Sequence, residues 1–279
     1  MNMEFLIATN GFKGTWSAIE YGTEMAKLMQ MKVALLGVTE NPNSDSKRQL
    51  DEMVERAVSL FKDRDVEYSL EIQNGEAEKV IPEKANSGDF ITVVGPLGRS
   101  QFKRWLTGRS IRPLLEKITG PILYVPETRL PLKRILISIG GLGYAESAEK
   151  LAIQFADTNK ADITILHVIP PTDLDYPTAN KVSSHVEDLV ETDTPQGRNL
   201  KKDMETAQEH GLKANVVVRQ GNVVEEILNE AKTGNYDLLC LGSPYSAHTL
   251  RHYYTPNVTA EVAESLLCPV LTARYESSE

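Results

Sequence analysis

The sequence has little of the features that mark secreted, disulfide-stapled or membrane-spanning proteins. It holds only two cysteines in 279 residues, Cys240 and Cys268, which favours buried thiols over a disulfide framework. No apolar run approaches the ~20 residues that span a bilayer. The first residues also lack the basic, apolar and small-residue layout of a signal peptide. We therefore expect a cytoplasmic protein that does not insert into membranes.

Positive charge is scarce as well. The 30 Lys and Arg residues are outnumbered by 39 Asp and Glu, which gives a net charge of −9. This excess argues against a general binder of nucleic acid or of anionic membranes. Hydrophobic residues make up 41% of the chain and charged residues 25%, as in ordinary globular proteins. The length suits two domains of about 140 residues, each with its own core.

Patterns that announce catalysis or metal binding are missing too. No Ser-His-Asp or Cys-His order, carboxylate pair or metal-ligand cluster emerges from the sequence. His248 and His252 are four residues apart, but no third ligand for zinc is placed nearby. The run 138–141 has part of the SGGxDS loop of ATP pyrophosphatases, without its aspartate and second serine. We expect no catalytic residue and no metal ligand.

The chain does have a distinctive glycine stretch, which follows the short apolar strand predicted at 91–94. Gly95, Gly98 and Gly108 form the pattern G-x2-G-x9-G, which is neither a Walker A loop nor GxGxxG. Glycine lets an anion approach main-chain N–H groups closely, and a helix is predicted to begin at the third glycine, over 109–118. Three basic residues lie between the glycines: Arg99, Lys103 and Arg104. The stretch predicts a phosphate-binding loop at the carboxyl end of a parallel strand.

Strand and helix patterns alternate along the chain and then repeat. Strands are predicted at 5–9, 33–38, 68–72, 91–94 and 122–125, with helical periodicity between them. After a linker at 126–131 the plan starts again, with strands at 134–139, 163–168, 216–220, 238–241 and 270–273. Matching glycines lie 146 and 147 residues apart, which we interpret as an internal duplication.

This order predicts the fold class and the domains. Strands that alternate with helices, joined by right-handed crossovers, form a doubly wound parallel sheet in an α/β fold. We expect one domain at 1–127 and a second at 132–279. The second is longer mainly because of an insertion at about 170–195, rich in Pro, Thr and Asp. We expect this insertion to be a loose surface loop, and an ordered flap over a site is the alternative.

The glycine spacing resembles the ATP-binding signature of the universal stress protein family. With the repeat, the chain is similar to a tandem universal stress protein over nearly its whole length. The resemblance implies two tandem Rossmann-like domains, each with a five-stranded parallel sheet of order 3-2-1-4-5. Many members of the family bind ATP at the carboxyl edge of strands 1 and 4, and others bind none.

The resemblance also implies nucleotide-binding residues in the first half. The family's aspartate after strand 1 is here Asn10, an uncharged amide and a weaker partner for ribose hydroxyls. The valine that touches adenine is Val38. The position after the third glycine is Arg109, which would either grip a phosphate bidentately or block the pocket, and Ser110 is the candidate for the hydroxyl role. The full predicted set is Ala8, Thr9, Asn10, Val38, Val94, Gly95, Gly98, Arg99, Gly108, Arg109 and Ser110.

The second half departs further from the signature. Gly242 and Ser243 are kept, but Tyr245 stands at the second glycine position and Gly140 at the acidic one. We expect this half not to bind ATP in the family manner and to pair with the first half instead. Because family dimers commonly pair through the last strand, this implies pairing of 122–125 with 270–273 within one chain, and a homodimer stays open.

Two tryptophans and a histidine lie near the predicted sites. Trp16 and Trp105 are candidates for stacking on a base, although we expect them to cover the core. His167, at a strand end, is expected to be a packed residue.

The resemblance implies a non-catalytic, cytoplasmic stress-response protein. We expect it to bind ATP, with or without Mg²⁺, or another adenine nucleotide in its first half; slow ATP hydrolysis stays open. One alternative is a nucleotide-independent interaction protein in which both sites are degenerate. Another is an adenylate-forming or pyrophosphatase enzyme of the same broad fold.

Overall fold

The computed structural model describes residues 3–40, 45–97, 111–139, 146–169, 193, 195–242 and 258–273. The chain divides into two compact units. The first holds Met1–Leu130 and Ala263–Ala273, and the second holds Pro131–Val262 and Arg274–Glu279. Each is described by itself below.

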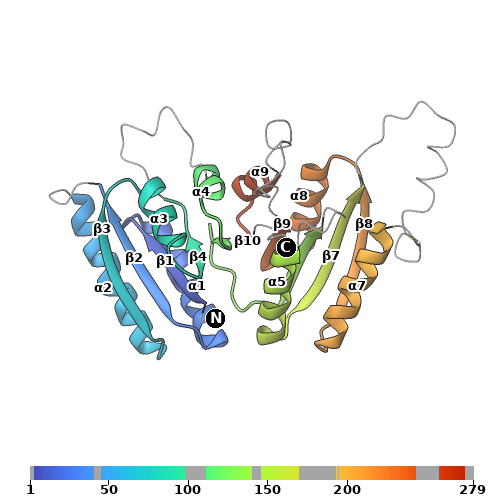
Figure 1. Ribbon diagram of the computed structural model, residues 1–279, viewed down its shortest axis with the longest axis horizontal. Helices are drawn as coiled ribbons and strands as arrows, with labels where there is room; N and C mark the ends of the chain where they lie inside the picture. The colour runs from blue at the N-terminus through green and yellow to red at the C-terminus, as the bar shows by residue number, and fades with distance from the viewer. Residues whose placement is uncertain are drawn as a thin grey trace. The chain divides into compact units, whose positions relative to one another are not determined.

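The first unit is a doubly wound α/β sheet (Figure 1). Its elements are β1 (Glu4–Thr9), η1 (Lys13–Thr15), α1 (Trp16–Met29), β2 (Val33–Thr39), α2 (Asp45–Asp63), β3 (Tyr68–Asn74), α3 (Ala77–Ala85), β4 (Phe90–Val94), α4 (Arg112–Lys117), β5 (Ile122–Tyr124) and β10 (Val270–Ala273). The strand order is β3-β2-β1-β4-β5-β10. The first five strands run parallel, and β10 is antiparallel to β5.

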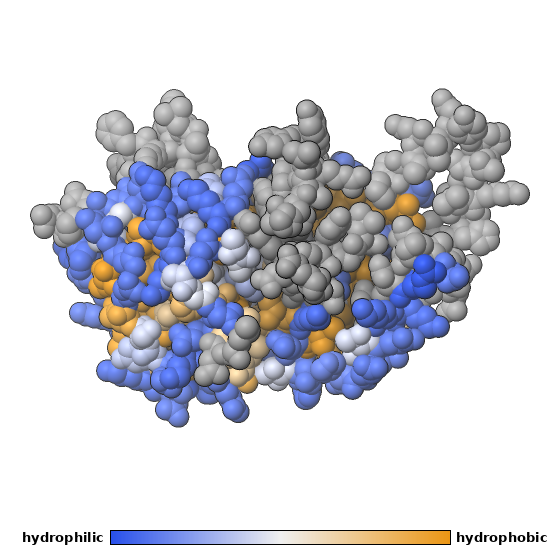
Figure 2. All heavy atoms as spheres, in the orientation of Figure 1, coloured by the Kyte–Doolittle hydropathy of each residue, from blue (hydrophilic) through white to orange (hydrophobic). Residues whose placement is uncertain are grey.

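Burial along the strands follows their place in this sheet. All seven residues of β2 are buried, as expected for a strand with neighbours on both sides and helices on both faces. The outer strand β3 is exposed along most of its length. Leu70 and Ile72 on it are 45% and 43% exposed, and Figure 2 shows hydrophobic surface over this strand.

The second unit repeats the same plan. Its elements are β6 (Arg134–Ile139), α5 (Glu146–Asn159), β7 (Asp162–Ile169), α7 (Pro195–Glu209), β8 (Ala214–Gln220), α8 (Val223–Thr233) and β9 (Leu238–Gly242), while α9 (Val258–Ser265) crosses into the first unit. The strand order is β9-β6-β7-β8, all parallel.

Matching positions of the two units share unusual backbone conformations. Gln30 ends α1 with φ 54° and Lys160 follows α5 with φ 53°. Gly75 follows β3 with φ 151° and Gly221 follows β8 with φ 156°. These values lie in a region that most side chains avoid, so they recur because the turns are built alike.

The predicted fold class is confirmed. The order predicted for the first sheet is present, and each predicted strand there agrees with an observed one within two residues. The helix predicted over 109–118 is described only as Arg112–Lys117, because 98–110 lie outside the described residues. The predicted insertion lies outside them for 170–192 and 194, and α7 begins at Pro195.

Candidate functional site

The predicted site lies where β1 and β4 end. These strands are neighbours in the middle of the first sheet, with Ala8 opposite Val94. β2, the strand that follows β1 in the chain, lies on one side of the β1–β4 pair, and β5, the strand that follows β4, lies on the other side. The two connections therefore diverge at this edge, which is the switch point where doubly wound sheets bind ligands.

The loop after β1 is held by a chain of hydrogen bonds. The Gly11 N–H donates to Thr9 Oγ1 over 3.1 Å, and Thr9 Oγ1 lies 2.6 Å from Thr15 Oγ1. The Thr15 hydroxyl donates to the Phe12 carbonyl over 2.7 Å. Both threonines are fully buried. The end of β1 and the start of α1 are thus joined by side-chain hydroxyls beneath the loop.

Asn10 and Gly11 shape the turn above this chain. Asn10 Oδ1 accepts the Phe12 N–H over 3.2 Å, an Asx turn that directs the backbone away from the strand. Gly11 has φ +79°, and a Cβ there would lie 2.5 Å from the Leu50 nitrogen of α2. Only glycine fits this position, because both the dihedral angle and the space exclude a side chain.

Gly95 brings the loop after β4 against the loop after β1. A Cβ on Gly95 would lie 2.8 Å from the Gly14 carbonyl oxygen and 2.9 Å from Thr15 Cα. The end of β5 is tied to the same place, since Ser17 Oγ lies 2.7 Å from the Val125 carbonyl oxygen and donates to it. The first glycine of the signature is therefore required where the two loops meet.

The predicted site residues divide into two groups. Four described side chains, Ala8, Thr9, Val38 and Val94, are at most 1% exposed, and Gly95 is buried. Asn10 is partly exposed. The rest of the predicted set, Gly98, Arg99, Gly108, Arg109 and Ser110, lies outside the described residues. The structure thus brings the β1, β2 and β4 residues to one edge of the sheet and does not describe the remainder of the loop.

Trp16 lies beside this edge under a cation. The Arg56 guanidinium of α2 lies 3.5 Å from the centroid of the indole ring, so one face of Trp16 is covered by Arg56. Trp105, the other tryptophan considered for stacking, lies outside the described residues.

Sequence reasoning missed Thr15, Gly14, Ser17 and Arg56. No motif marks them, because their roles depend on contacts with β4, β5 and α2. The one available signal was the run of glycine and hydroxyl residues just after the first strand.

At the matching edge of the second unit, a histidine replaces a glycine. His167 on β7 pairs with Ile139, as Gly37 on β2 pairs with Thr9. His167 is buried, and its Nδ1 lies 3.1 Å from the Ile139 carbonyl oxygen. A carbonyl only accepts, so Nδ1 carries the proton. Burial lowers the pKa of His167, and the hydrogen bond to Ile139 partly opposes this. The expectation of a packed histidine is confirmed.

The departures predicted for the second unit are not described. They fall on Gly140 and Tyr245, and the retained Ser243 and the pair His248 and His252 lie outside the described residues as well.

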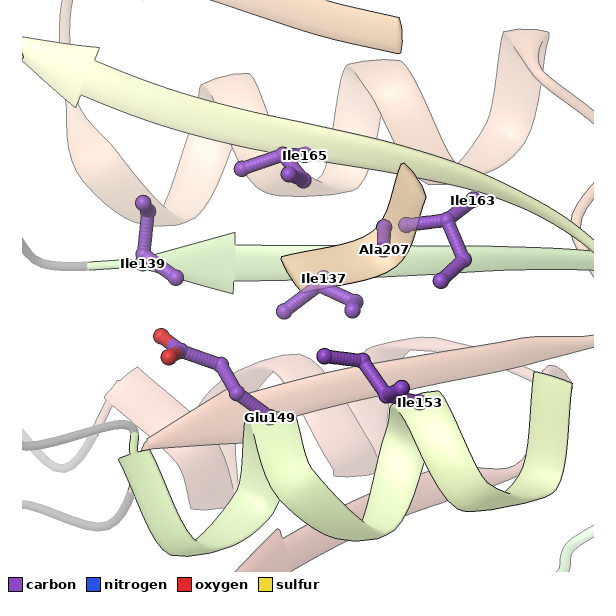
Figure 3. A pocket seen from close by; sticks show the side chains of 7 residues that line it. All are labelled: Ile137, Ile139, Glu149, Ile153, Ile163, Ile165 and Ala207. Carbon is purple, nitrogen blue, oxygen red and sulfur yellow. The ribbon is translucent and has the colours of Figure 1, made fainter. Parts of the chain in front are cut away.

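A small apolar pocket in the second unit lies between α5, α7 and the sheet (Figure 3). Five isoleucines, Glu149 and Ala207 line it: Ile137, Ile139, Ile153, Ile163 and Ile165. Phe61 is the residue of the first unit that matches Ala207. The carbonyl of each accepts the N–H of the residue five positions later in the chain, so the two residues lie at the same point near the end of their helices. The inner volume of about 10 Å³ is near the minimum for one water molecule. The described side chains that line the pocket therefore leave a packing defect in the apolar core.

Within the described ranges, no group of three His, Cys, Asp or Glu side chains is placed to hold a metal ion. None of the described helices combines the length and the hydropathy required to cross a bilayer.

Comparison with known proteins gives one family. The model described as "Universal stress protein family" matches residues 131–274. Universal stress protein YxiE of Bacillus subtilis (strain 168) is 27% identical over 146 residues, which cover 50% of this chain and 98% of that protein.

Two solved structures align with nearly the whole chain. A universal stress protein from Archaeoglobus fulgidus DSM 4304 covers 100% of this chain and 98% of its own, with a TM-score of 0.67 and 17% identity. The alignment with the functionally unknown protein PA1789 from Pseudomonas aeruginosa PAO1 covers 97% of this chain and 92% of that chain, with a TM-score of 0.64 and 14% identity. At such identities the likeness concerns the fold alone.

Proposed function

The chain belongs to the universal stress protein family, and on that basis we propose that it is a non-catalytic, cytoplasmic stress-response protein that binds ATP or another adenine nucleotide in its first unit. We propose further that both halves, 1–127 and 132–279, are domains of this family in tandem. The shared strand order and the repeated turns of the two units support this reading.

The observation that carries the nucleotide proposal is the close approach at Gly95. The first glycine of the signature lies where the loops after β1 and β4 meet, with no room for a side chain. A phosphate-binding loop that starts here would run along the switch-point edge, with its main-chain N–H groups close to a ligand.

Each predicted residue has a role in this proposal. Gly95, Gly98 and Gly108 let the main chain approach the phosphates, and Arg99, Arg109 and Ser110 supply charge and a hydroxyl. Ala8, Thr9, Val38 and Val94 form the floor beneath the base, and Asn10 lies at the base or ribose side. Mg²⁺ would accompany the phosphates of ATP, held by those phosphates and not by a cluster of protein carboxylates.

The second half would serve assembly. We propose that it does not bind ATP in the family manner and that the two domains pair within one chain through their last strands. The antiparallel register of β5 with β10, in which Leu123 faces Leu271, supports such pairing. A homodimer of the whole chain is compatible with this arrangement.

A nucleotide-independent interaction protein is the second candidate. The Asn10 carboxamide stands where the family has a carboxylate, and its oxygen already accepts the Phe12 N–H. Val38 is only 1% exposed. Both observations favour a first unit that has lost its ligand and retains its fold.

Calorimetric titration of ATP and of AMP, with Mg²⁺, into nucleotide-stripped protein separates the two candidates. We expect about one ATP per chain and loss of binding in Gly108→Val, because valine side-chain atoms would occupy the phosphate position. Gly211→Ala is the control for a glycine substitution in the second unit: its Cβ would meet nothing within 4 Å, and the strain from its φ of +68° should lower stability and leave binding unchanged. The absence of heat at millimolar ATP would overturn the nucleotide proposal in favour of the second candidate.

A further inference from the structure

Thr15 lies at the junction of η1 and α1, and it is not among the residues proposed to hold the nucleotide. Its side chain is 0% exposed. A threonine at this helix-capping position normally accepts an N–H from the first turn. Within the described residues Thr15 makes no such bond, and its hydroxyl turns back toward β1. Helix capping therefore does not explain this buried hydroxyl.

The donor and the acceptor can be assigned in each hydrogen bond of the Thr15 hydroxyl. Its one hydroxyl proton goes to the Phe12 carbonyl, 2.7 Å away. Thr15 Oγ1 then only accepts at its 2.6 Å contact with Thr9, so the Thr9 hydroxyl is the donor there. Thr9 Oγ1 in turn accepts the Gly11 N–H. Removal of the Thr15 oxygen would leave the Thr9 proton without this buried acceptor. It would also remove the hydrogen bond to the Phe12 carbonyl, so the turn would lose its ties to Thr15 at Thr9 and at Phe12.

The same residue sets the position of the glycine loop. A Cβ on Gly95 would lie 2.9 Å from Thr15 Cα and 2.8 Å from the Gly14 carbonyl oxygen. The backbone at 14–15 is thus the surface against which the chain leaves β4. A shift of Thr15 would move the start of the phosphate loop as well as the turn that carries Asn10.

We propose that Thr15 is a positioning residue that holds the two loops of the nucleotide site in register through its hydroxyl, a role that rests on the proposed function of the first unit. Thr15 touches no ligand in this scheme. It acts through Thr9 and Gly11 on one side and through Gly95 on the other.

The test compares Thr15→Val, which deletes the hydroxyl at nearly constant shape, with Thr15→Ser, which keeps it. Thr23→Val is the matched control, because Thr23 is a buried threonine on the same helix whose hydroxyl donates to the Ile19 carbonyl over 2.5 Å. For each full-length variant, ATP affinity is measured by calorimetry and amide exchange of Gly11 by NMR. A thermal melt confirms that each variant is folded.

We expect Thr15→Val to weaken ATP binding about threefold to tenfold and to speed exchange of the Gly11 amide by a similar factor, as for one lost hydrogen bond. Thr15→Ser should restore both, and Thr23→Val should change neither. Equal affinity and exchange in Thr15→Val and wild type would overturn the proposal, as would a loss that serine does not rescue. If wild type binds no nucleotide, the proposed function fails, and Gly11 exchange alone still decides whether Thr15 holds the loop.

Discussion

At the scale of single residues, the first unit buries two threonine hydroxyls without using them. Thr92 is 0% exposed and Thr272 is 4% exposed, and neither Oγ1 has a hydrogen-bond partner in the described part of the chain. They flank Ile122 in register on β4 and β10. We expect Thr92→Val to raise the free energy of unfolding by about 1 kcal/mol, because it replaces a buried unpaired hydroxyl by a methyl group of the same shape.

Urea unfolding measures this change. Thr23→Val should instead lower the free energy of unfolding by about 0.5–1.5 kcal/mol, since it deletes a hydroxyl that donates to a carbonyl. A loss of stability in Thr92→Val would contradict the prediction and show that its hydroxyl is engaged.

A pH dependence of stability follows from His167. Burial lowers its pKa in the folded protein below the ordinary value of about 6.5. The unfolded chain therefore takes up this proton at a higher pH than the folded chain does. The contribution of His167 is fully present above about pH 6.5 and is lost as the pH falls through the lowered pKa.

Urea midpoints at pH 7.5, 6.5 and 5.5 check this prediction. We expect the midpoint of wild type to fall over this range, and His167→Gln to flatten the fall. His210→Gln is the control, because the side chain of His210 is 46% exposed. Identical slopes in wild type and His167→Gln would count against the assignment.

At the scale of elements, one side chain joins two helices of the first unit. Asn86 follows α3, and its Nδ2 donates to the Lys117 carbonyl of α4 over 2.9 Å. Its Oδ1 accepts the Thr119 N–H at 2.9 Å and the Thr119 hydroxyl at 3.0 Å. We expect Asn86→Ala to lower the free energy of unfolding by about 1 kcal/mol in urea titration, because these bonds are solvent-exposed and replaceable by water.

Asn86→Asp is the matched variant, since aspartate keeps the acceptor for Thr119 and loses the donor to Lys117. It should lie between wild type and Asn86→Ala. Equal stability of all three proteins would show that the hydrogen bonds of the Asn86 side chain contribute nothing to the free energy of unfolding.

Elements were predictable from the sequence where burial forces a pattern. The uniform apolar run of β2 and the glycine after β4 are visible because a strand covered on both faces excludes polar residues and a tight loop excludes side chains. The hydroxyl chain of Thr9 and Thr15 left no such trace. Threonine serves equally well in caps, strands and cores, so its partner is known only once β1 and α1 are placed.

At the scale of the whole molecule, β10, which begins at Val270, completes the sheet of a unit whose first strand begins at Glu4. β5 has β4 on one side and β10 on the other. A chain that ends at residue 130 would keep β1 to β5, with β4 still paired to β5, and would lose β10 from the other side of β5. An unpaired inner strand edge recruits another copy, so we expect this fragment to self-associate with increasing concentration.

Light scattering over a range of concentrations measures this association. The full-length chain is the comparison, since its β5 edge is already paired. A fragment that stays monomeric at the highest concentration would show that β10 is dispensable for closing this edge.

The pairing of β5 with β10 also has a consequence for the order in which the protein is made. β5 ends at Tyr124 and β10 begins at Val270, so 145 residues separate the two strands. A ribosome that adds ~5–20 residues per second needs roughly 7–30 s to make them. During that time β5 lacks its second neighbour, because β10 has not yet been made. Helices and hairpins form in microseconds, so the rest of the first unit has time to fold before β10 is available. The nascent chain therefore presents an open strand edge to chaperones and to neighbouring nascent chains until β10 has been made.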